Sequence, residues 1–446
     1  LVDSYETAIE QMIVDNPALH ASEIGASARL VARMRQSAAR MREGVGLLKQ
    51  DELLLRAFRL ANEAMLLQMW RTSSNSRLNG QTRSPEAPVD RTPSISDLPF
   101  EEYHWRPFQL AFMLMNVGPL SRNDNEYRDI VDLIWFPTGG GKTEAYLFVT
   151  AFEVMRRRLE KGERGGGTTV ISRYTMRLLT AQQFERAATL ACAMEHLRRQ
   201  HAASLGETSI DIGLWIGQDN TPNTFVGAKD AVDEIEPSWT PPNPFAIQRC
   251  PWCHTRLIPG NDEPIANIGF KATNSSFVVS CPNRTCDFAG SIPVQVVDDA
   301  LYLKPPTILL AVADKFAALP RETRIRNFLG GNGTEPPSLI IQDELHLLGS
   351  SLGTVFGVYE AAIDTVLGQL GGGVRPHIIA STATIRDASA QVRNLFGRDC
   401  RVFPSPGLSA DFNFFSALDR SVPGRIYAGV AAPSHTPSTS IIRTIA

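Results

Sequence analysis

One short run limits what this chain can fold into more than any other feature: Trp135-Phe136-Pro137-Thr138-Gly139-Gly140-Gly141-Lys142-Thr143. A largely apolar segment, residues 131–136, leads into it, and an amphipathic helical pattern, residues 144–159, follows it. Strand, glycine turn, Lys-Thr and helix is the order of a phosphate-binding loop. Glycines let successive backbone N–H groups converge on phosphate oxygens, and the helix adds the positive end of its dipole. The run therefore predicts an α/β fold with a nucleotide site.

Each part of this loop has an expected partner on ATP and Mg²⁺. Lys142 is expected to reach the β- and γ-phosphates, and the Thr143 hydroxyl is expected to ligate Mg²⁺. Phe136 stands where the usual pattern begins with glycine, which weakens the match to small GTPases and favours helicase-like motors. A glycine-rich turn with a chance lysine is the alternative. The loop residues predicted to bind the nucleotide are Thr138, Gly139, Gly140, Gly141, Lys142 and Thr143.

Composition and charge describe an ordinary globular chain. Its 446 residues are 43% hydrophobic and 20% charged, and this length suggests roughly three domains. No run reaches the ~18 apolar residues of a membrane span, and no signal peptide opens the chain, so a cytoplasmic protein without a membrane partner is expected. With a net charge of −3, any nucleic acid must be met by a local groove and not by overall attraction.

The rest of the chain alternates between predicted strands and helices. Such a rhythm predicts a parallel sheet covered by helices on both faces. The predicted strands are residues 168–172, 210–216, 307–312, 338–342 and 377–381, and a long helix is predicted over 173–199. The expected domains are a helical domain at 1–72, a linker at 73–99, a motor domain at 100–236 and 298–405, an insert at 237–297, and at 406–446 a linker with the first strand, 425–431, of a second motor domain.

The insert carries two close cysteine pairs, Cys250 with Cys253 and Cys281 with Cys286. In a cytosolic chain such pairs indicate metal rather than disulfides, and four thiolates suit a tetrahedral Zn²⁺ that has no open position. A structural zinc contributes apparently ~10–16 kcal/mol to a small module, against about 2–4 kcal/mol for one disulfide. Because the insert is small, a zinc-ribbon-like module held together by a structural zinc is expected.

A second anchor is the apolar strand that ends in Asp343-Glu344-Leu345-His346. Asp343 is expected to hold Mg²⁺, usually through water, and Glu344 to orient and deprotonate the attacking water. His346 is a candidate link between this site and the next motif. In that motif, Ala380-Ser381-Thr382-Ala383-Thr384, the hydroxyls can bond the acidic residues, so Ser381, Thr382 and Thr384 are predicted couplers of nucleotide state and polymer binding. A Ser/Thr helix cap is the alternative reading.

Upstream of the loop, Trp105-Arg106-Pro107-Phe108-Gln109 heads a predicted helix. In helicase-like motors, an Arg-Pro-aromatic-Gln element at a similar distance before the phosphate loop contacts the adenine of ATP. Arg106 and Gln109 are therefore predicted to contact the nucleotide. A structural helix cap is the alternative.

At these residues the chain resembles the first motor domain of superfamily 2 helicases of the DExH type. The loop matches motif I, Asp343 to His346 matches motif II, and Thr382-Ala383-Thr384 matches motif III. The resemblance implies a RecA-like parallel sheet and backbone contacts with nucleic acid, which carry little sequence information. It assigns those contacts to Arg173, Tyr174, Arg177 and Gln182 in motif Ia, and to Asp314 and Lys315 in a later motif.

Longer phrases resemble the DrmA family, the helicases of DISARM, a bacterial anti-phage system associated with DNA methylation. These phrases include Ala57-Phe58-Arg59-Leu60-Ala61-Asn62-Glu63-Ala64-Met65 and Phe403-Pro404-Ser405-Pro406-Gly407-Leu408. The resemblance implies a DNA-dependent ATPase that acts on single-stranded DNA, or DNA with single-stranded ends, beside a DrmB-like protein partner.

Two alternatives stay open at this point. The first is an RNA helicase or the motor subunit of a restriction enzyme, and the second is an ATP-gated platform that binds DNA or a partner without unwinding. No second-motor motif and no arginine finger is found in the sequence. Since the ATP site of this superfamily lies between two motor domains, the resemblance implies that this chain alone binds ATP but hydrolyses it poorly.

Overall fold

The computed structural model describes most of the chain, and the predicted strand at 425–431 lies outside the described part. The described residues are 1–446 without 17–20, 79, 137–138, 175–180, 218–220, 236–241, 261–263, 265–266, 331–332, 383–386, 410–411, 420, 422–435, 437, 440 and 442–446.

The centre of the molecule is an eight-stranded sheet whose strand order is β10-β1-β9-β8-β2-β7-β3-β6. Each pair of neighbouring strands in it is parallel, so the predicted α/β fold with a parallel sheet is confirmed. The strands are β1 (Val131–Trp135), β2 (Val170–Tyr174), β3 (Ile212–Trp215), β6 (Val294–Gln295), β7 (Ile308–Val312), β8 (Leu339–Gln342), β9 (His377–Thr382) and β10 (Cys400–Phe403).

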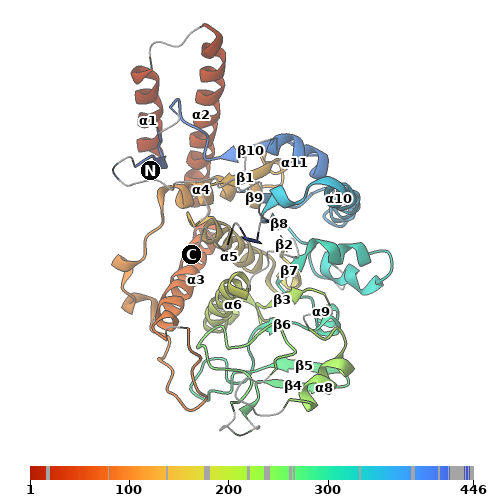
Figure 1. The fold of residues 1–446 in the computed structure, drawn as a ribbon. Coiled ribbons are helices and arrows are strands. Elements are labelled where there is room, and N and C mark those ends of the chain that lie inside the picture. The colour runs from red at the N-terminus through yellow and green to blue at the C-terminus, as the bar shows by residue number, and fades with distance from the viewer. Residues whose placement is uncertain are drawn as a thin grey trace.

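Helices cover both faces of this sheet (Figure 1). Alternate residues of β8 show the two faces: Leu339 and Ile341 belong to a core shared with α4, α5 and α6, whereas Ile340 belongs to a core shared with α9, α10 and α11. Burial on both faces explains why the strands are nearly continuous apolar runs. The helices are α4 (Pro107–Ser121), α5 (Lys142–Lys161), α6 (Ala181–Gln200), α7 (Ala202–Leu205), α9 (Asp298–Leu303), α10 (Ser350–Leu370) and α11 (Ala388–Phe396).

The N-terminal helices α1 (Val2–Asp15), α2 (Ala21–Gln50) and α3 (Glu52–Ser76) form an outer layer over the first of these faces. Asp51 caps α3 by accepting a hydrogen bond from the Leu54 N–H at 3.1 Å. Gly44 lets α2 approach α4 closely, because a Cβ there would lie 2.1 Å from the Leu114 carbonyl oxygen. Helix α3 packs against α5 and α6. The predicted helical segment therefore shares its core with the sheet domain.

A buried charge cluster ties α2 to the sheet. Arg40 donates two hydrogen bonds to Asp132 of β1, at 2.7 and 2.6 Å, and His377 of β9 lies 3.2 Å from the same carboxylate. Burial acts to raise the pKa of Asp132, but Arg40 and His377 outweigh it and lower this pKa to about 2. The carboxylate is thus charged and fully paired inside the core.

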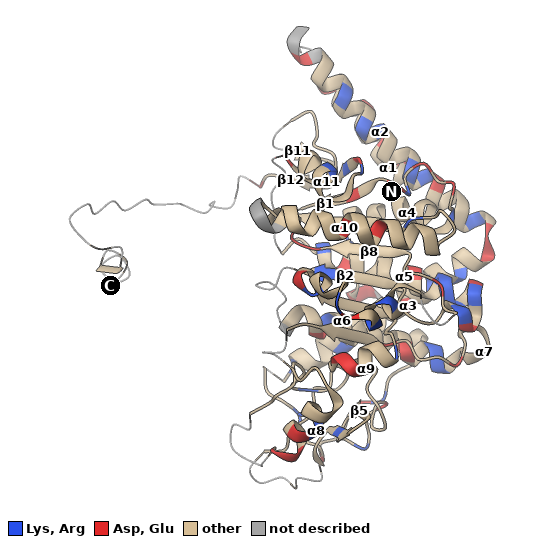
Figure 2. Ribbon diagram, turned by 90° about the vertical axis from the view of Figure 1, so that its right-hand side faces the viewer, with Lys and Arg blue, Asp and Glu red and all other residues tan. Residues whose placement is uncertain are grey.

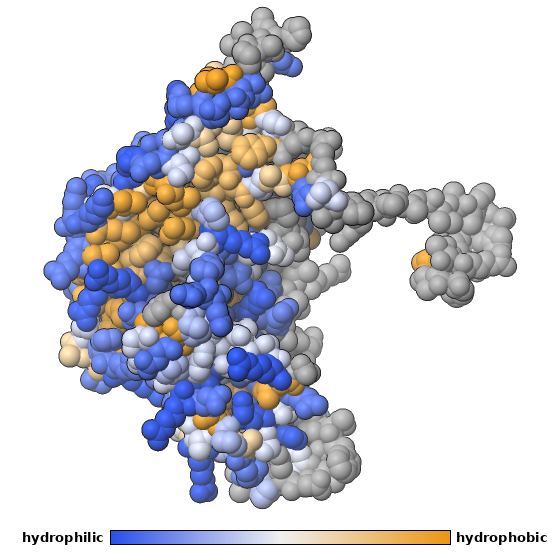
Figure 3. Space-filling view, turned by 90° about the vertical axis from the view of Figure 1, so that its left-hand side faces the viewer, coloured by the Kyte–Doolittle hydropathy of each residue, from blue (hydrophilic) through white to orange (hydrophobic). Residues whose placement is uncertain are grey.

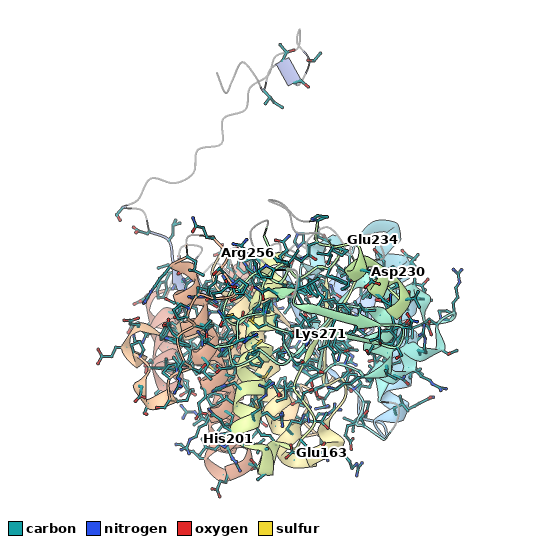
Figure 4. The ribbon with its side chains drawn as sticks, turned by 90° about the horizontal axis from the view of Figure 1, so that it is seen from below. Glu163, His201, Asp230, Glu234, Arg256 and Lys271 are labelled. Carbon is teal, nitrogen blue, oxygen red and sulfur yellow. The ribbon has the colours of Figure 1, made fainter. Side chains whose placement is uncertain are left out.

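The insert lies at the opposite end of the molecule from α1 and α2 (Figure 1). Its strands β4 (Phe270–Thr273) and β5 (Ser276–Val279) form an antiparallel hairpin, and α8 (Phe225–Asp233) packs on that hairpin. Asp230 of α8 and Lys271 of β4 both lie on this end when the molecule is seen from below (Figure 4). Strand β6 falls inside the range predicted for the insert, yet it pairs with β3 in the main sheet.

The segment predicted as a linker, residues 73–99, is held against the insert. The Arg83 N–H donates to the His254 carbonyl at 3.0 Å, the Val89 N–H donates to the Thr285 hydroxyl at 3.2 Å, and Asn283 donates to the Ala87 carbonyl at 2.6 Å. Backbone groups make most of these bonds, so the polar composition of the segment gives no sign of them.

The remaining short elements connect these layers. They are the hairpin strands β11 (Phe412–Asn413) and β12 (Ser416–Ala417) and the 3₁₀ turns η1 (Ile95–Asp97), η2 (Phe100–Glu102), η3 (Gly162–Gly165), η5 (Ala313–Ala318), η6 (Thr323–Leu329) and η7 (Leu345–Leu347). Charged residues of both signs alternate along the ribbon on the side of the molecule that carries α9 and α10 (Figure 2). Among the described helices, none combines the length and the apolar character needed to cross a membrane.

The sequence pattern places the start of one helix too close to the N-terminus. The helix expected over residues 173–199 starts in the described chain at Ala181, as α6, whereas Arg173 and Tyr174 still belong to β2. The reason is that Arg173, a polar residue in sequence, is fully buried beside Glu360 of α10. A paired buried arginine interrupts the apolar pattern by which a strand is recognised.

Candidate active site

Strand order brings three predicted motifs to one edge of the sheet. The phosphate loop follows β1, the acidic motif follows β8, and Ser381 and Thr382 end β9, which lies between those two strands. All three strands are parallel, so their carboxyl ends face the same way. In open parallel sheets this is the edge at which ligands bind.

The phosphate loop is described from Gly139 onward, and Thr138 lies outside the described residues. Gly139 and Gly141 adopt left-handed backbone angles, φ 79° and 92°, which glycine accepts without strain. Lys142 is half-buried, and its ammonium donates to the Phe136 carbonyl at 2.7 Å. Burial lowers the pKa of Lys142, although Glu344 and Asp343 act in the opposite direction. The hydrogen bond to Phe136 directs the lysine side chain back along the loop.

Phe136 has a structural role that explains its presence in place of glycine. Its ring stacks on Phe108 of α4, with centroids 4.0 Å apart and planes inclined by 10°. This contact fixes the start of the loop to the helix that follows Arg106. The departure from the usual loop pattern is thus a packing contact.

Arg106 and Gln109 both hold the loop. Arg106 donates to the Gly140 carbonyl at 2.7 Å, and the Gln109 amide donates to the Gly141 carbonyl at 2.8 Å. The amide oxygen of Gln109 accepts the Arg106 N–H at 2.8 Å and so caps α4. A side chain on residue 141 would meet Gln109 at 2.7 Å. The amide nitrogen and the amide oxygen of Gln109 are thus both hydrogen-bonded within the protein, as the helix-cap alternative expects, and contact with adenine stays a prediction.

Asp343 is surrounded by hydrogen-bond donors. The Tyr146 hydroxyl donates to one of its oxygens at 2.9 Å, while the Ser381 hydroxyl and the Glu344 N–H donate to the other. Tyr146 also lies 3.3 Å from the Thr143 hydroxyl. Burial raises the pKa of Tyr146 well above its ordinary value, so its hydroxyl keeps the proton it donates.

The oxygen atoms of Thr143 and Asp343 lie close enough together to hold Mg²⁺. Thr143 and Asp343, the two predicted ligands, are both within hydrogen-bond distance of one Tyr146 oxygen. Two adjacent hard oxygens are what Mg²⁺ prefers, together with substrate phosphates. The residues present therefore fit the ion. Tyr146 was missed by sequence reasoning, although its position three residues after Thr143 places both side chains on one helix face.

Glu344 and His346 form the other side of the acidic motif. Glu344 has a left-handed backbone, φ 49°, and its carboxylate lies 3.4 Å from the His346 ring. The same ring nitrogen is 3.3 Å from the Thr382 hydroxyl, so His346 lies between the acidic motif and the end of β9, and its role as a link between them stays a prediction. Burial, followed by the charge of Asp343, raises the pKa of Glu344. Thr384 lies outside the described residues.

A cavity of about 480 Å³ joins these parts. Ligand pockets in proteins span about 300–1,000 Å³, so a nucleotide-sized molecule has room. Its walls include Lys142, Thr143, Asp343 and Glu344, together with Gln182 and Arg186 from the start of α6. Arg186 is paired with Glu144 at 3.0 Å.

The residues predicted to contact nucleic acid do not form one surface. Arg173 is fully buried, with its guanidinium 4.9 Å from the centre of the Phe316 ring, so contact with a polymer is not open to it in this structure. Tyr174 is buried as well, and Gln182 lines the nucleotide cavity. Asp314 is exposed, and Lys315 pairs with Asp298 at 2.7 Å. Arg177 lies outside the described residues.

The four predicted zinc ligands come together. The sulfur atoms of Cys250, Cys253, Cys281 and Cys286 all lie within 4.8 Å of one another, and all four residues are buried. Four thiolates at such spacing suit tetrahedral Zn²⁺, so the donor set fits the ion. The Thr255 hydroxyl lies 3.1 Å from the Cys253 sulfur and the Phe288 N–H donates to Cys286, as is usual for partners that orient metal ligands.

The chain is 34% identical, over an alignment of 510 positions that covers all of it, to DISARM protein DrmA of Bacillus paralicheniformis (strain ATCC 9945a / NCIMB 11709 / CD-2). The whole chain resembles DrmA. This confirms the resemblance predicted from the longer phrases. The alignment spans 42% of that DrmA, so the chain corresponds to less than half of its relative. No protein-family model matches the chain.

Parts of three solved structures are also similar, each at low identity. The DUF1998 helicase MrfA bound to DNA has 13% identity and a TM-score of 0.31, covering 74% of this chain and 34% of that one. The helicase Lhr of Mycobacterium smegmatis bound to ssDNA and AMP-PNP has 15% identity and a TM-score of 0.37, covering 68% and 26%. Mss116p bound to ssRNA and AMP-PNP has 10% identity and a TM-score of 0.33, covering 71% and 46%.

Proposed function

We propose that this chain carries the ATP-binding half of a superfamily 2, DExH-type motor that moves along or unwinds DNA in DISARM-like phage defence. The observation that carries the proposal is the meeting of Lys142, Thr143, Asp343 and Glu344 around one cavity at the carboxyl edge of a parallel sheet. The similarity to DrmA along the whole chain supports the biological setting.

The side chains have distinct roles in this proposal. Lys142 leaves the Phe136 carbonyl and binds the β- and γ-phosphates, whereas the loop N–H groups bind the remaining phosphate oxygens. Thr143 and Asp343 would hold Mg²⁺, which neutralises phosphate charge when bound. Tyr146 and Ser381 keep Asp343 in place. Glu344 accepts the proton of the attacking water, and its raised pKa makes it a better base than an ordinary glutamate.

Coupling to the polymer would pass through His346. Its ring contacts both Glu344 and Thr382, so a change at the γ-phosphate that moves Glu344 is felt at the end of β9. The polymer proposed is DNA, single-stranded or with single-stranded ends, and a DrmB-like protein is the proposed partner in the cytoplasm. The zinc module is proposed to be structural.

The test is ATP hydrolysis by the full-length protein, titrated with single-stranded DNA, duplex DNA and RNA of equal length. We expect stimulation by single-stranded DNA. Glu344→Gln should retain ATP binding and lose turnover by at least about a hundredfold, the scale of a lost general base. Unchanged turnover in Glu344→Gln would contradict the assigned base, and stimulation by RNA alone would favour an RNA helicase. Normal phage protection by Lys142→Ala would favour an ATP-gated binding platform.

A further inference from the structure

Arg173 joins three elements that surround the carboxyl ends of β2, β7 and β8. Its side chain is fully buried at the end of β2 and donates from Nη1 to the carboxylate of Glu360 on α10, so both partners of this ion pair are shielded from solvent. Helix α10 lies on the opposite side of the molecule from the one seen in Figure 3, which carries the N-terminal helices and shows apolar patches in a hydrophilic surface. The pair therefore belongs to the interior and not to a surface.

Two aromatic rings hold the Arg173 guanidinium. Its central carbon lies 4.9 Å from the centre of the Phe316 ring and 5.6 Å from the centre of the Phe356 ring, and both distances are within the range of a cation–π contact. Phe356 belongs to α10, whereas Phe316 belongs to η5, which follows β7 and contains Lys315. The side chain thus connects α10 to a segment that is predicted to contact nucleic acid.

The backbone of Arg173 contacts the acidic motif. Its carbonyl accepts the Asp343 N–H at 3.1 Å, because Arg173 lies directly beside Gln342, the last residue of β8, in the parallel register. Asp343 is one of the two side chains proposed to hold Mg²⁺. Arg173 therefore contacts the acidic motif through its backbone, and α10 and η5 through its side chain.

Stability alone does not account for the Arg173–Glu360 pair. Nε and Nη2 of Arg173 and Oε1 of Glu360 are buried, and none of these three atoms has a hydrogen-bond partner among the described residues. A buried pair of this kind contributes little net stability, and apolar residues of similar volume often replace such pairs without loss. The best-attested use of a buried charged pair is to fix one arrangement of the elements that it joins.

We propose that Arg173 is a positioning residue that transmits the state of the nucleotide site to η5 and α10, so that nucleotide and DNA change each other's affinity through it. This rests on the proposed motor function. A displacement of Asp343 when the nucleotide site fills moves the Arg173 carbonyl, and the side chain carries the movement to Phe316 and Glu360. Arg173 touches neither nucleotide nor DNA in this role.

The test measures the affinity of the full-length protein for a single-stranded oligodeoxynucleotide by fluorescence anisotropy, with and without AMP-PNP and Mg²⁺. The ratio of the two affinities reports the coupling between the sites, which is typically about 5–150-fold in allosteric proteins. Arg173→Met combined with Glu360→Leu removes both charges and keeps most of the volume of the pair. We expect the melting temperature of this double variant to stay near that of the wild type, and the affinity ratio to fall to about one.

A second variant and a matched control accompany this measurement. Phe316→Leu keeps the ion pair and removes one ring from the guanidinium, so it should lower the affinity ratio in the same direction. The control is the pair of Arg398 and Asp364, which also involves α10. Because Arg398 donates to the Pro376 carbonyl before β9, this pair lies at the amino ends of the strands, away from the acidic motif. Arg398→Met combined with Asp364→Leu should keep the affinity ratio of the wild type.

The outcomes separate this inference from the proposed function. If the wild type binds no single-stranded DNA, or binds it with the same affinity in the presence and absence of AMP-PNP, the proposed motor function is wrong. If the wild type shows a clear affinity ratio and both the Arg173/Glu360 double variant and Phe316→Leu keep it, the pair serves packing alone and the inference is wrong. An equal loss of the ratio in the Arg398/Asp364 control would also contradict the inference, because any disturbance of α10 would then have the same effect.

Discussion

At the scale of single residues, the site is organised around shared hydrogen bonds to Asp343. Tyr146 and Ser381 come from α5 and β9, and each donates to a different oxygen of that carboxylate. Since Tyr146 also contacts Thr143, it connects the two side chains proposed to hold Mg²⁺. We infer that Tyr146 is a positioning residue, which sets the separation of the ligands and does not touch the reacting atoms.

This role predicts a specific defect in Tyr146→Phe. The variant removes one oxygen and keeps the ring in the core, so stability should fall by only about 1 kcal/mol, the net value of a hydrogen bond. The Mg²⁺ concentration for half-maximal ATP hydrolysis should rise several-fold, and turnover at saturating Mg²⁺ should recover. Titration of ATPase activity with Mg²⁺ checks this. A purely structural tyrosine would lower activity equally at all Mg²⁺ concentrations.

Protonation of Glu344 should determine how ATPase activity falls at low pH. Its pKa is raised by burial and by Asp343, and a general base works only when it is deprotonated. As the pH falls, Glu344 therefore takes up its proton at a higher pH than an ordinary glutamate, whose pKa is about 4.3. ATPase activity should therefore begin to decline at a higher pH than an ordinary glutamate would impose. Measured turnover that stays flat down to the ordinary glutamate pKa would contradict Glu344 as the base.

At the scale of elements, the Arg40–Asp132–His377 cluster predicts how firmly α2 is held on the sheet. Arg40→Met removes one partner and leaves the Asp132 carboxylate buried. Breaking a buried pair in this way costs about 3–5 kcal/mol, so the melting temperature should fall clearly. Arg42→Met is the matched control on the same helix, since Arg42 is about half exposed with its partners Asp3 and Glu6 near the surface. It should leave the melting temperature unchanged.

Sequence patterns predict strands well where the buried residues of the strand are all apolar. The runs expected at residues 307–312 and 338–342 are β7 and β8 to within one residue at either end, because β-branched residues facing two cores leave no other reading. The strand order is beyond such patterns, since parallel neighbours such as β1 and β9 are joined by long connections. Arg173 shows the other limit: a buried ion pair, invisible in sequence, extends β2 where a helix was predicted.

Some residues of the candidate site could be predicted from sequence, and others could not. Lys142, Asp343 and Glu344 could be predicted, because their chemistry requires those residue types after a strand. Tyr146 could not, because its contact with Asp343 joins α5 to the end of β8, and only the folded chain reveals that these two elements are close. Arg106 and Gln109 were expected at the nucleotide, and the structure shows them holding the phosphate loop by its carbonyls.

At the scale of the whole molecule, the four-cysteine module is joined to the helices that wall the nucleotide cavity. Arg71 of α3 lies over the ring of Trp252, 4.7 Å from its centre, and Asn75 donates to the Trp252 carbonyl at 3.1 Å. From α6, Thr189 donates to the Pro251 carbonyl at 3.1 Å. Pro251 and Trp252 stand between the first two cysteines, so the metal site sets the position of the residues that α6 and α3 contact.

The same two helices carry Met69 and Gln182 into the nucleotide cavity. Loss of the metal should therefore weaken ATP binding at a distance. We expect Cys250→Ser, or treatment of the protein with a strong chelator, to lower the melting temperature, since structural zinc contributes apparently ~10–16 kcal/mol in small modules. ATP affinity should fall several-fold at temperatures at which the sheet domain remains folded, as judged by circular dichroism.

Cys400→Ser is the matched control, because Cys400 lies in β10, outside the four-cysteine cluster. It should keep both the metal content and the ATP affinity of the wild type. The decisive comparison is ATP affinity against zinc content across partially chelated samples. If affinity follows zinc content, the module acts as a brace for α3 and α6. If the metal is lost while ATP affinity is kept, the contacts through Arg71, Asn75 and Thr189 do not reach the cavity, and the module serves another surface of the protein.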